Sequence, residues 1–453
     1  MSDTMQKIVS LCKRRGFVFP GSEIYGGLAN SWDYGPLGAQ LRKNIKDSWW
    51  KTFVEKREDM LGLDGAVILN PRVWEASGHV ATFNDPLVED VKTHKRYRAD
   101  HLLEDADVNI HGMDMATMAK AIQEHGIKSP DGNALSEPRQ FNLMFQTTIG
   151  PVQEDGNTVY LRPETAQAIF VNFKNVLTSS RKRIPFGIGQ IGKAFRNEIT
   201  PGNFIFRTLE FEQMEIEYFI EEKDWKEIFT DWENAMQDWA KDIGLDISKI
   251  SLLDIQKEEL AHYSKKTIDI EFEFPFGKKE LWGLAYRTDF DLRSHQEHSK
   301  EKLEYTDPDD NKRKFLPHVI EPSFGVDRTL LALLVSAYKE EVVDGEERIV
   351  LQFAPHMAPY QIAVLPLMKK EPLGSKAKEV FELLQKNFRV EYDDSGSIGK
   401  RYRRQDEIGT PFCVTIDFDT VENGSVTIRH RDSMEQERMS VENLISFLKE
   451  KIA

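Results

Sequence analysis

Cysteine is scarce in this chain of 453 residues, which contains only Cys12 and Cys413. The two lie far apart and neither belongs to a Cys-x-x-Cys pair, so the sequence excludes a disulfide framework and a zinc knuckle, and we expect no zinc. No apolar run is long enough to cross a membrane, and the opening MSDTMQKIVSLCKRRG lacks the hydrophobic core of a secretion signal. These absences favour a protein of the reducing cytoplasm without membrane contact.

An excess of positive charge is also absent, since the formal net charge is -15. Indiscriminate binding to nucleic acid is therefore disfavoured, because it depends on neutralising phosphates. A specific RNA partner is still compatible with this charge, because local basic patches matter more than the sum. Four short patches occur, at 13–15, 181–183, 312–314 and 400–404. Each is most simply a solvated surface run; the last is the most informative, because Tyr402 lies among its arginines.

The segment 187–218 predicts an antiparallel hairpin. Its first part, GIGQIGKAFRNE, and its last part, TLEFEQMEIEYF, alternate between two faces as strands do, and ITPGNFIF between them carries the turn residues Pro201, Gly202 and Asn203. Arginines on both arms suit a polyphosphate, because each guanidinium offers a planar fork of donors to phosphate oxygens. A solvated hairpin with cross-strand salt bridges explains the same charges equally well.

Other patterns place the remaining elements. A stripe of apolar residues at four-residue spacing predicts a long amphipathic helix beginning at Pro36, namely Leu37, Leu41, Ile45, Trp49 and Phe53. The next segment, AVILNPRVW, predicts a strand interrupted by Pro71. HVIEPSFGVDRTLLALLVSAY predicts a strand that leads through Gly325 into a helix, whose start can face an anion. A capping or salt-bridge role explains Arg328 there as well. From residue 349 onward, strands alternating with helices predict a compact α/β domain of about 100 residues.

Three of these segments together resemble the motifs of class II aminoacyl-tRNA synthetases. The amphipathic helix and proline-bearing strand resemble motif 1; Phe195-Arg196-Asn197-Glu198 with Arg207 and Phe211 resembles motif 2; Glu321-Pro-Ser-Phe-Gly-Val-Asp-Arg328 resembles motif 3. YGGLANSWDYGPLG, RPETAQ and YRTDFDL are similar to the dimeric type of glycyl-tRNA synthetase. GSIGKRYRRQDEIGTPFCVTID is similar to the anticodon-binding domain shared with histidyl, prolyl and threonyl synthetases. The resemblance covers essentially the whole chain.

This resemblance implies an α+β fold in two domains. Residues 1–348 are expected to form a catalytic domain, an antiparallel sheet flanked by helices, with insertions at about 85–138, 222–262 and 299–314. Residues 349–453 are expected to form an α/β anticodon-binding domain. The implied activity is ATP-dependent ligation of glycine to glycine tRNA through a glycyl-adenylate, with release of pyrophosphate and AMP. Motif 1 also implies a homodimer, and a long apolar stripe with two tryptophans fits a contact between identical subunits.

The resemblance assigns roles residue by residue. Arg196, Arg207 and Arg328 are the expected catalytic residues, because positioning and charge stabilisation on the phosphates are what the reaction requires. The expected ATP-binding residues are Arg196, Asn197, Glu198, Phe206, Arg207, Phe211, Glu280, Leu281, Gly325, Asp327 and Arg328. The expected glycine-binding residues are Arg98, Glu164, Phe211, Gln213, Glu215, Arg287, Glu321 and Ser323. One or more Mg²⁺ ions are expected on Glu210 or Glu321.

The C-terminal domain is expected to hold the tRNA anticodon through Arg401, Arg403, Arg404, Arg429 and Arg431, since single-stranded bases are bound by mixed basic and aromatic side chains. A surface ion pair explains each arginine separately about as well. Two other functions stay open. One is a non-catalytic, synthetase-like subunit that binds nucleic acid, which the retained arginines and acids disfavour. The other is a synthetase for a different amino acid, which is disfavoured because a glycine pocket excludes larger residues sterically and needs no editing domain.

Overall fold

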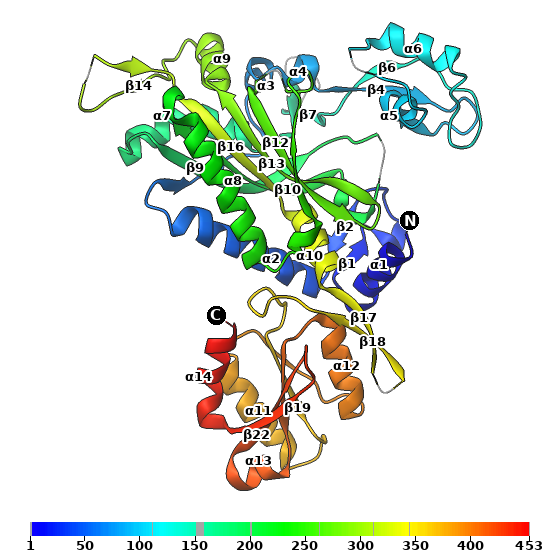
Figure 1. The fold of residues 1–453 in the computed structure, drawn as a ribbon, viewed down its shortest axis with the longest axis vertical. Coiled ribbons are helices and arrows are strands. Elements are labelled where there is room, and N and C mark those ends of the chain that lie inside the picture. Colours follow the sequence, from blue (N-terminus) through cyan, green and yellow to red (C-terminus); the bar gives the residue numbers. More distant parts are fainter. Residues whose placement is uncertain are drawn as a thin grey trace.

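A computed structural model describes residues 2–110, 112–150, 158–199, 202–261, 263–310, 312–343 and 345–452. Its largest element is a seven-stranded sheet of order β11-β12-β13-β16-β10-β9-β3 (Figure 1). Every neighbouring pair is antiparallel except β3 with β9. The strands are β3 (Met60–Gly62), β9 (Phe186–Phe195), β10 (Glu210–Ile220), β11 (Ile250–Asp254), β12 (Lys266–Phe274), β13 (Gly277–Thr288) and β16 (His318–Gly325). The predicted antiparallel sheet is confirmed.

The predicted hairpin forms the centre of this sheet. β9 and β10 pair antiparallel from Phe195 opposite Glu210 to Phe186 opposite Phe219. A 3-10 turn, η4 (Phe204–Phe206), lies in the connection. The part of the predicted turn at Pro201 lies outside the described residues. The alternation along both arms therefore predicted the strands correctly, and in β10 it places Phe211, Gln213 and Glu215 on one face, where they line a cavity.

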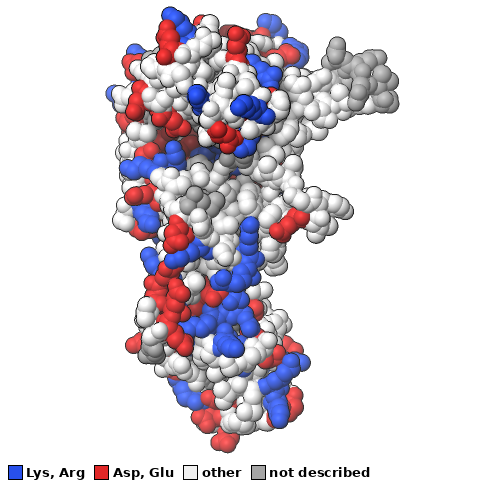
Figure 2. All heavy atoms as spheres, turned by 90° about the vertical axis from the view of Figure 1, so that its right-hand side faces the viewer, with Lys and Arg blue, Asp and Glu red and all other residues white. Residues whose placement is uncertain are grey.

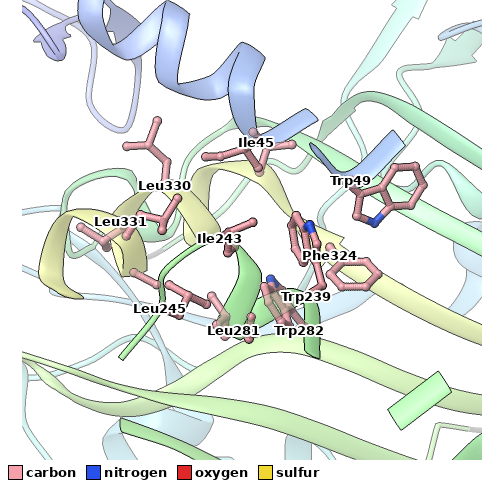
Figure 3. Close-up of a cluster of buried hydrophobic side chains, with 14 of the residues drawn as sticks. Ile45, Trp49, Trp239, Ile243, Leu245, Leu281, Trp282, Phe324, Leu330 and Leu331 are labelled. Atoms are coloured by element: carbon pink, nitrogen blue, oxygen red, sulfur yellow. The ribbon is translucent and has the colours of Figure 1, made fainter. Parts of the chain in front are cut away.

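One face of the sheet is apolar and covered by three helices: α2 (Pro36–Trp50), α8 (Trp225–Asp242) and α10 (Val326–Ala337). Figure 3 shows where they meet the sheet: Trp239 of α8 packs against Trp282 of β13 and Phe324 of β16, beside Trp49 of α2. Trp282 and Phe324 are opposite each other in the register. Because strand residues alternate between faces, this apolar packing turns their polar neighbours to the other side.

The stripe on α2 is part of this core. Leu41, Ile45, Trp49 and Phe53 are all buried within the chain's own hydrophobic cluster. The helix is confirmed and continues as a π-helical turn, η2 (Lys51–Glu55). The interpretation of the stripe as a contact between subunits is wrong, because α8, α10 and the sheet already cover it. Burial in the monomer and in a dimer interface select the same residue types, so periodicity does not separate them.

The expected strand around Pro71 is wrong. Pro71 begins a helix, α3 (Pro71–Ala76), and Asn70 caps it by accepting a hydrogen bond from the Arg72 N–H at 3.0 Å. Upstream, only Ile68 forms an isolated bridge, to Leu161. Proline fits the first turn of a helix because its missing N–H would have no partner there.

The predicted inserted subdomain is a small unit with its own core, drawn in cyan in Figure 1. A three-stranded sheet of order β5-β4-β6 packs with the helices α5 and α6 around Val88, Leu103 and Met118. Its elements are β4 (Asn84–Glu89), β5 (Arg96–Arg98), α5 (Ala99–Glu104), α6 (Met115–Glu124) and β6 (Arg139–Asn142). The short helix α4 (His79–Thr82) leads into it.

The rest of the N-terminal part surrounds the large sheet. α7 (Ala166–Ser180) and α9 (Phe290–Ser299) contact each other, and α7 also contacts β10. The remaining elements are α1 (Asp3–Arg15), β1 (Val18–Pro20), η1 (Glu23–Tyr25), β2 (Trp32–Tyr34), β7 (Gln146–Thr148), β8 (Thr158–Tyr160), η5 (Glu222–Asp224), η6 (Ile247–Lys249), β14 (Tyr305–Thr306) and β15 (Lys314–Phe315).

The C-terminal part is a second sheet with a separate core, and the predicted α/β pattern is confirmed. The sheet order is β20-β19-β21-β22-β23, parallel at β20-β19-β21 and antiparallel beyond. The hairpin of β17 and β18 connects the two parts (Figure 1). The elements are β17 (Tyr338–Val343), β18 (Glu346–Leu351), β19 (Ile362–Pro366), α11 (Leu373–Leu384), β20 (Val390–Tyr392), α12 (Ile398–Ile408), β21 (Phe412–Ile416), α13 (Phe418–Asn423), β22 (Ser425–His430), β23 (Gln436–Ser440) and α14 (Val441–Ile452).

Candidate active site

The polar face of the large sheet opens into a cavity of about 420 Å³. The register explains the convergence: Ser323 of β16 lies opposite both Glu215 of β10 and Gly283 of β13, and Glu321 lies opposite Ala285. All the residues expected to bind ATP or glycine line this cavity except Arg98 and Asn197: Glu164, Arg196, Glu198, Phe206, Arg207, Phe211, Gln213, Glu215, Glu280, Leu281, Arg287, Glu321, Ser323, Gly325, Asp327 and Arg328.

Three carboxylates and one arginine form the deep end of the cavity. The Glu215 carboxylate accepts hydrogen bonds from the Thr165 N–H at 3.1 Å, from the Ser323 hydroxyl at 3.1 Å and from the Thr165 hydroxyl. Arg287, which is 2% exposed, donates to Glu321 Oε1 at 2.8 Å. The Gln167 amide donates to Glu164 at 3.0 Å. Several acids facing a small space are arranged to receive a cation, because their mutual repulsion is relieved when one binds.

The pKa shifts of these acids divide them into two kinds. Burial raises the pKa of Glu215, and the nearby Glu164 charge raises it further. Burial likewise raises the pKa of Glu321 to about 8, although Arg287 opposes the shift. Burial would raise the pKa of Glu164 too, but the charge of His79 and then that of Arg287 hold it below its usual range. Of the three, Glu164 is therefore the acid whose pKa is held below its usual range.

Three arginines from three different segments form the other end. Arg196 follows β9, donates from Nε to the Pro163 carbonyl at 3.1 Å, and lies 5.3 Å from the ring centres of both Phe83 and Phe211. Arg207 follows η4, and among the described residues its guanidinium has one charged partner, Glu198, at the long distance of 3.9 Å. Arg328, in the first turn of α10, donates to Glu280 at 2.9 Å. Most guanidinium donors of this group are left for a ligand in the cavity.

Glu164 is held at the cavity because the segment 162–165 packs closely against β9. Arg162 crosses over Gly192 of β9, where an added Cβ would lie 2.1 Å from the Arg162 Nη2. Arg162 then donates to the Lys193 carbonyl at 2.6 Å and to the Gly65 carbonyl at 2.8 Å. Only glycine leaves room for this crossing. The segment 162–165 is thereby held against the sheet, with Glu164 facing the cavity.

Three predicted site residues lie outside the cavity. Arg98 bonds to Asp85 and Asp100 within the inserted subdomain. Asn197 donates its N–H to the Leu143 carbonyl at 2.8 Å. Glu210 is half exposed and pairs with Lys193 at 3.1 Å, in a hollow beside the cavity. Their predicted contacts with glycine, ATP and metal receive no support from this arrangement.

Asp327 lines the cavity, but its carboxylate is used by the protein. It accepts from the Glu212 N–H at 2.8 Å and from the Tyr34 hydroxyl, and pairs with Arg42 at 3.3 Å. These bonds tie the start of α10 to β10, α2 and β2. Asp327 thus positions the neighbouring Arg328 relative to the hairpin, and the predicted contact of Asp327 with ATP receives no support from these bonds.

The two acids expected to hold Mg²⁺ do not fit that role together. Glu210 lies at the surface beside Lys193, whereas Glu321 is buried and bonded to Arg287. Mg²⁺ prefers ionised carboxylates in octahedral geometry, and the raised pKa of Glu321, caused by burial, favours its protonated form. Across the described residues, no three His, Cys, Asp or Glu side chains are grouped to hold a metal ion. Any Mg²⁺ would enter with the polyphosphate.

Sequence reasoning missed several residues that support the acidic end. Tyr263 lies 3.9 Å from the Arg287 guanidinium, measured to its ring centre, and Asp291 bonds that guanidinium at 2.8 Å and 2.9 Å. Glu217 is fully buried, and among the described residues neither of its carboxylate oxygens has a partner. Burial raises its pKa strongly. Its position two residues after Glu215 on one strand face was a usable signal, whereas nothing in the local pattern marked Tyr263.

A groove of about 810 Å³ lies between the C-terminal domain and the N-terminal part, because Arg15 of α1 and Val343 of β17 line it together with residues of α12 and β22. We call it the basic groove after its cationic lining residues, which are Arg15, Lys400, Arg403, Arg404 and Arg429. Figure 2 shows one side of the molecule, with Lys and Arg gathered on its lower half. Arg403 and Arg404 are about one-third exposed. Of the five predicted anticodon arginines, these two and Arg429 line the groove.

The other two do not reach it. Arg401 is 2% exposed and donates to the Pro366 carbonyl at 2.6 Å. Arg431 is 3% exposed and donates to the Gly409 and Phe353 carbonyls at 2.8 Å. Arg429 itself is 4% exposed and bonded twice to Asp406. The guanidinium groups of Arg401 and Arg431 satisfy buried carbonyls. Their predicted contacts with the anticodon receive no support from this arrangement.

Comparisons with known proteins agree with both parts of the fold. Residues 145–337 match the class II core domain model of tRNA synthetases (G, H, P, S and T), and residues 361–451 match the anticodon binding domain model. The chain is 54% identical to a glycine–tRNA ligase of Bacillus cereus over 457 residues, 99% of each chain. The chain belongs to the glycine–tRNA ligase family. Further members are that of Alkaliphilus oremlandii, 54% identical over 99% of this chain and 98% of its own, and that of Geobacillus thermodenitrificans, 53% identical over 100% and 98%.

Membership of the glycine–tRNA ligase family confirms the predicted resemblance and the class II fold. The core match contains β9, β10, β13, β16 and α10, and with them all three cavity arginines. The anticodon binding match contains α12 and β22, and hence most of the basic groove. Among the described residues, no helix is long and apolar enough to cross a membrane.

Proposed function

We propose that this chain attaches glycine to glycine tRNA in two steps at the sheet cavity. The proposal rests on one observation: a single cavity has both a small acidic end (Glu164, Glu215 and Glu321) and an arginine end. An ammonium fits the first and a polyphosphate the second. A ligand that combines an amino acid with ATP uses both.

In the first step, a glycine carboxylate oxygen attacks the α-phosphorus of ATP, and pyrophosphate leaves with the bonding electrons. No side chain need act as nucleophile, because the substrate supplies it. Arg196 would hold the attacking carboxylate and the α-phosphate. Arg207 and Arg328 would hold the outer phosphates. Fixed guanidinium groups lower the barrier because they are oriented before charge develops.

In the second step, a terminal ribose hydroxyl of tRNA attacks the glycyl carbonyl carbon, and AMP leaves. The adenine would lie beside Phe211 and Phe206, with Glu198 available to its amino group. The basic groove would hold the anticodon arm.

We further propose that the protein works in the cytoplasm and forms a homodimer, as the resemblance of motif 1 implies. Light scattering at micromolar concentration tests the dimer, and a monomeric mass would contradict it.

The deciding experiment is exchange of labelled pyrophosphate into ATP, run against a panel of amino acids without tRNA. Exchange with glycine alone is expected. Exchange with a different amino acid would retain the reaction but overturn the assignment of the acidic end. A folded protein without exchange in the presence of Mg²⁺ would favour a role limited to binding nucleic acid.

A further inference from the structure

His79 lies outside the cavity but contacts Glu164, one of the three carboxylates at the acidic end of the cavity. His79, at the start of the short helix α4, lies with Nε2 3.3 Å from Glu164 Oε2. Its other ring nitrogen, Nδ1, lies 2.8 Å from the Ser77 hydroxyl, which is itself 3.4 Å from the Trp74 carbonyl. Both polar edges of the imidazole are therefore engaged, and the one towards the cavity meets a carboxylate.

Aromatic packing fixes the plane of this imidazole. Trp74 contacts it edge-on with ring centres 5.5 Å apart, and Phe83 contacts it at 5.3 Å. The His79 side chain is only 11% exposed. A ring that contacts two aromatic side chains and has partners at both nitrogens keeps its orientation without a substrate present. Such preorganisation is what a binding site requires of the groups behind its contacts.

The second oxygen of Glu164 is held from the opposite direction. Gln167 donates to Oε1 at 3.0 Å, and the same amide nitrogen donates to Asp291 at 3.0 Å. The carbonyl oxygen of Gln167 lies 2.7 Å from His295 Nε2, which orients the amide. Glu164 is thus clamped between His79 on one oxygen and Gln167 on the other, and its orientation does not depend on a ligand.

The electrostatic consequence distinguishes Glu164 from its neighbours. Glu215 and Glu321 line the same cavity, where none of the described lining residues is a histidine, and burial raises the pKa of each. For Glu164 the charge of His79, and then that of Arg287, outweighs the effect of burial on the pKa. Because Arg287 also opposes the pKa shifts of Glu215 and Glu321, His79 is the contact that sets Glu164 apart.

We propose that His79 is a positioning residue that holds the Glu164 carboxylate in place to receive the ammonium group of the amino-acid substrate. This inference rests on the proposed function, because it assumes that Glu164 binds that ammonium. His79 touches no substrate itself. Its removal leaves Glu164 free to rotate and to take up a proton, and so weakens binding of the amino acid without altering the arginine end of the cavity.

The test measures glycine-dependent pyrophosphate exchange for His79→Ala and His79→Gln. For His79→Ala the glycine KM is expected to rise about tenfold or more, the loss typical of a hydrogen bond to a charged group. The ATP KM should stay within about twofold, because Arg196, Arg207 and Arg328 are untouched. Gln can donate to Glu164 without carrying charge, so it should recover part of the glycine KM. The matched control is His94→Ala, which removes an exposed His–Glu pair of 2.9 Å in the inserted subdomain.

Each result decides the matter. A glycine KM unchanged in both variants, with wild-type exchange intact, would overturn the role of His79 and leave the proposed function standing. A fall in kcat with equal effects on glycine and ATP would show a merely structural role and also overturn it. If His79→Ala does not fold, His79→Gln alone carries the test. Absence of glycine-dependent exchange in the wild type would instead refute the proposed function, and this inference with it.

Discussion

The arginine end of the cavity and the C-terminal domain are both rich in arginine, but their guanidinium groups differ in how many donors are left for a ligand. At the arginine end, Arg196 gives one donor to a carbonyl, and among the described residues the Arg207 guanidinium pairs only with Glu198, at 3.9 Å. In the C-terminal domain, Arg429 is bonded twice to a buried aspartate, and Arg401 and Arg431 to backbone carbonyls. The first set is arranged for a ligand, and the second mainly holds the domain together.

The difference has a physical cause. A buried guanidinium must satisfy its donors internally, because leaving them unpaired costs several times more than a typical hydrogen bond contributes. A guanidinium at a cavity wall can keep donors for water or substrate. Arginine in a sequence motif is therefore evidence of a site only after its burial and its partners are known. The variants below test this contrast between the cavity and the C-terminal domain.

The largest effect is expected at the cavity. Arg196→Ala should lower glycine-dependent pyrophosphate exchange by about 100- to 1,000-fold, the usual loss when one preorganised charge-stabilising donor is removed. The thermal midpoint should change little, because the side chain makes a single hydrogen bond to the protein. Arg293→Ala, which removes an exposed α9 arginine paired with Asp289, is the matched control. Near wild-type exchange in Arg196→Ala would remove Arg196 from the mechanism.

The buried network of the C-terminal domain should respond in stability instead. Asp406 accepts from Arg348 at 2.9 Å and from Arg429 at 2.8 and 3.0 Å, and is fully buried. Asp406→Ala removes the carboxylate partner of the buried Arg429 and, among the described residues, leaves Arg348 paired with Glu341 alone. It should cost about 3–5 kcal/mol, measured by urea denaturation. The exposed Asp419→Ala should cost almost nothing. Equal stability of the two variants would show that this network contributes little.

Exposed arginines of the groove should affect only the RNA step. The double variant Arg403→Glu, Arg404→Glu is expected to weaken tRNA charging about tenfold or more and to reduce its dependence on salt, since phosphate contacts release counterions. Glycine-dependent exchange without tRNA should be unaffected. The control is Lys449→Glu, Lys451→Glu on α14, which reverses the same amount of charge outside the groove. Equal loss of both steps would contradict the division of labour.

The smallest effect is a pH dependence of glycine binding. Burial raises the pKa of Glu321 to about 8, so below that pH the group carries a proton that it must lose to accept an ammonium. The glycine KM should therefore fall as pH rises towards 8, by at most about tenfold per unit. Glu321→Gln should flatten this dependence, although its KM will be higher throughout. A wild-type KM independent of pH between about 6 and 8 would show that Glu321 does not ionise on binding.

Much of the fold could be predicted because its patterns are local. The alternation in β9 and β10 and the four-residue spacing in α2 follow from which face is buried. Pro71 was misinterpreted because a proline after a β-rich run fits an edge strand and a helix start equally well. The stripe on α2 was assigned to a dimer because apolar spacing records burial without recording the partner.

The motif residues of the cavity were identified in sequence because their types are dictated by phosphate and ammonium chemistry. Their supports were missed: His79 is distant in sequence from Glu164, and Tyr263 is distant from Arg287, so no local periodicity connects them. Asp291 lies only four residues after Arg287, but the burial of this pair depends on how the surrounding elements cover it. Glu217 was visible only as one more acid on a strand face. Its full burial depends on how other elements cover the sheet.

The amino-acid sequence by itself determined the class of the fold, the arginine and acid types at the centre, and the family. Only the tertiary structure decided which arginines keep donors for a ligand, which of three carboxylates has its pKa lowered, and whether an apolar stripe meets its own chain. The physical reason is that residue type and spacing are local properties, whereas burial, hydrogen-bond satisfaction and pKa depend on groups brought together from distant segments.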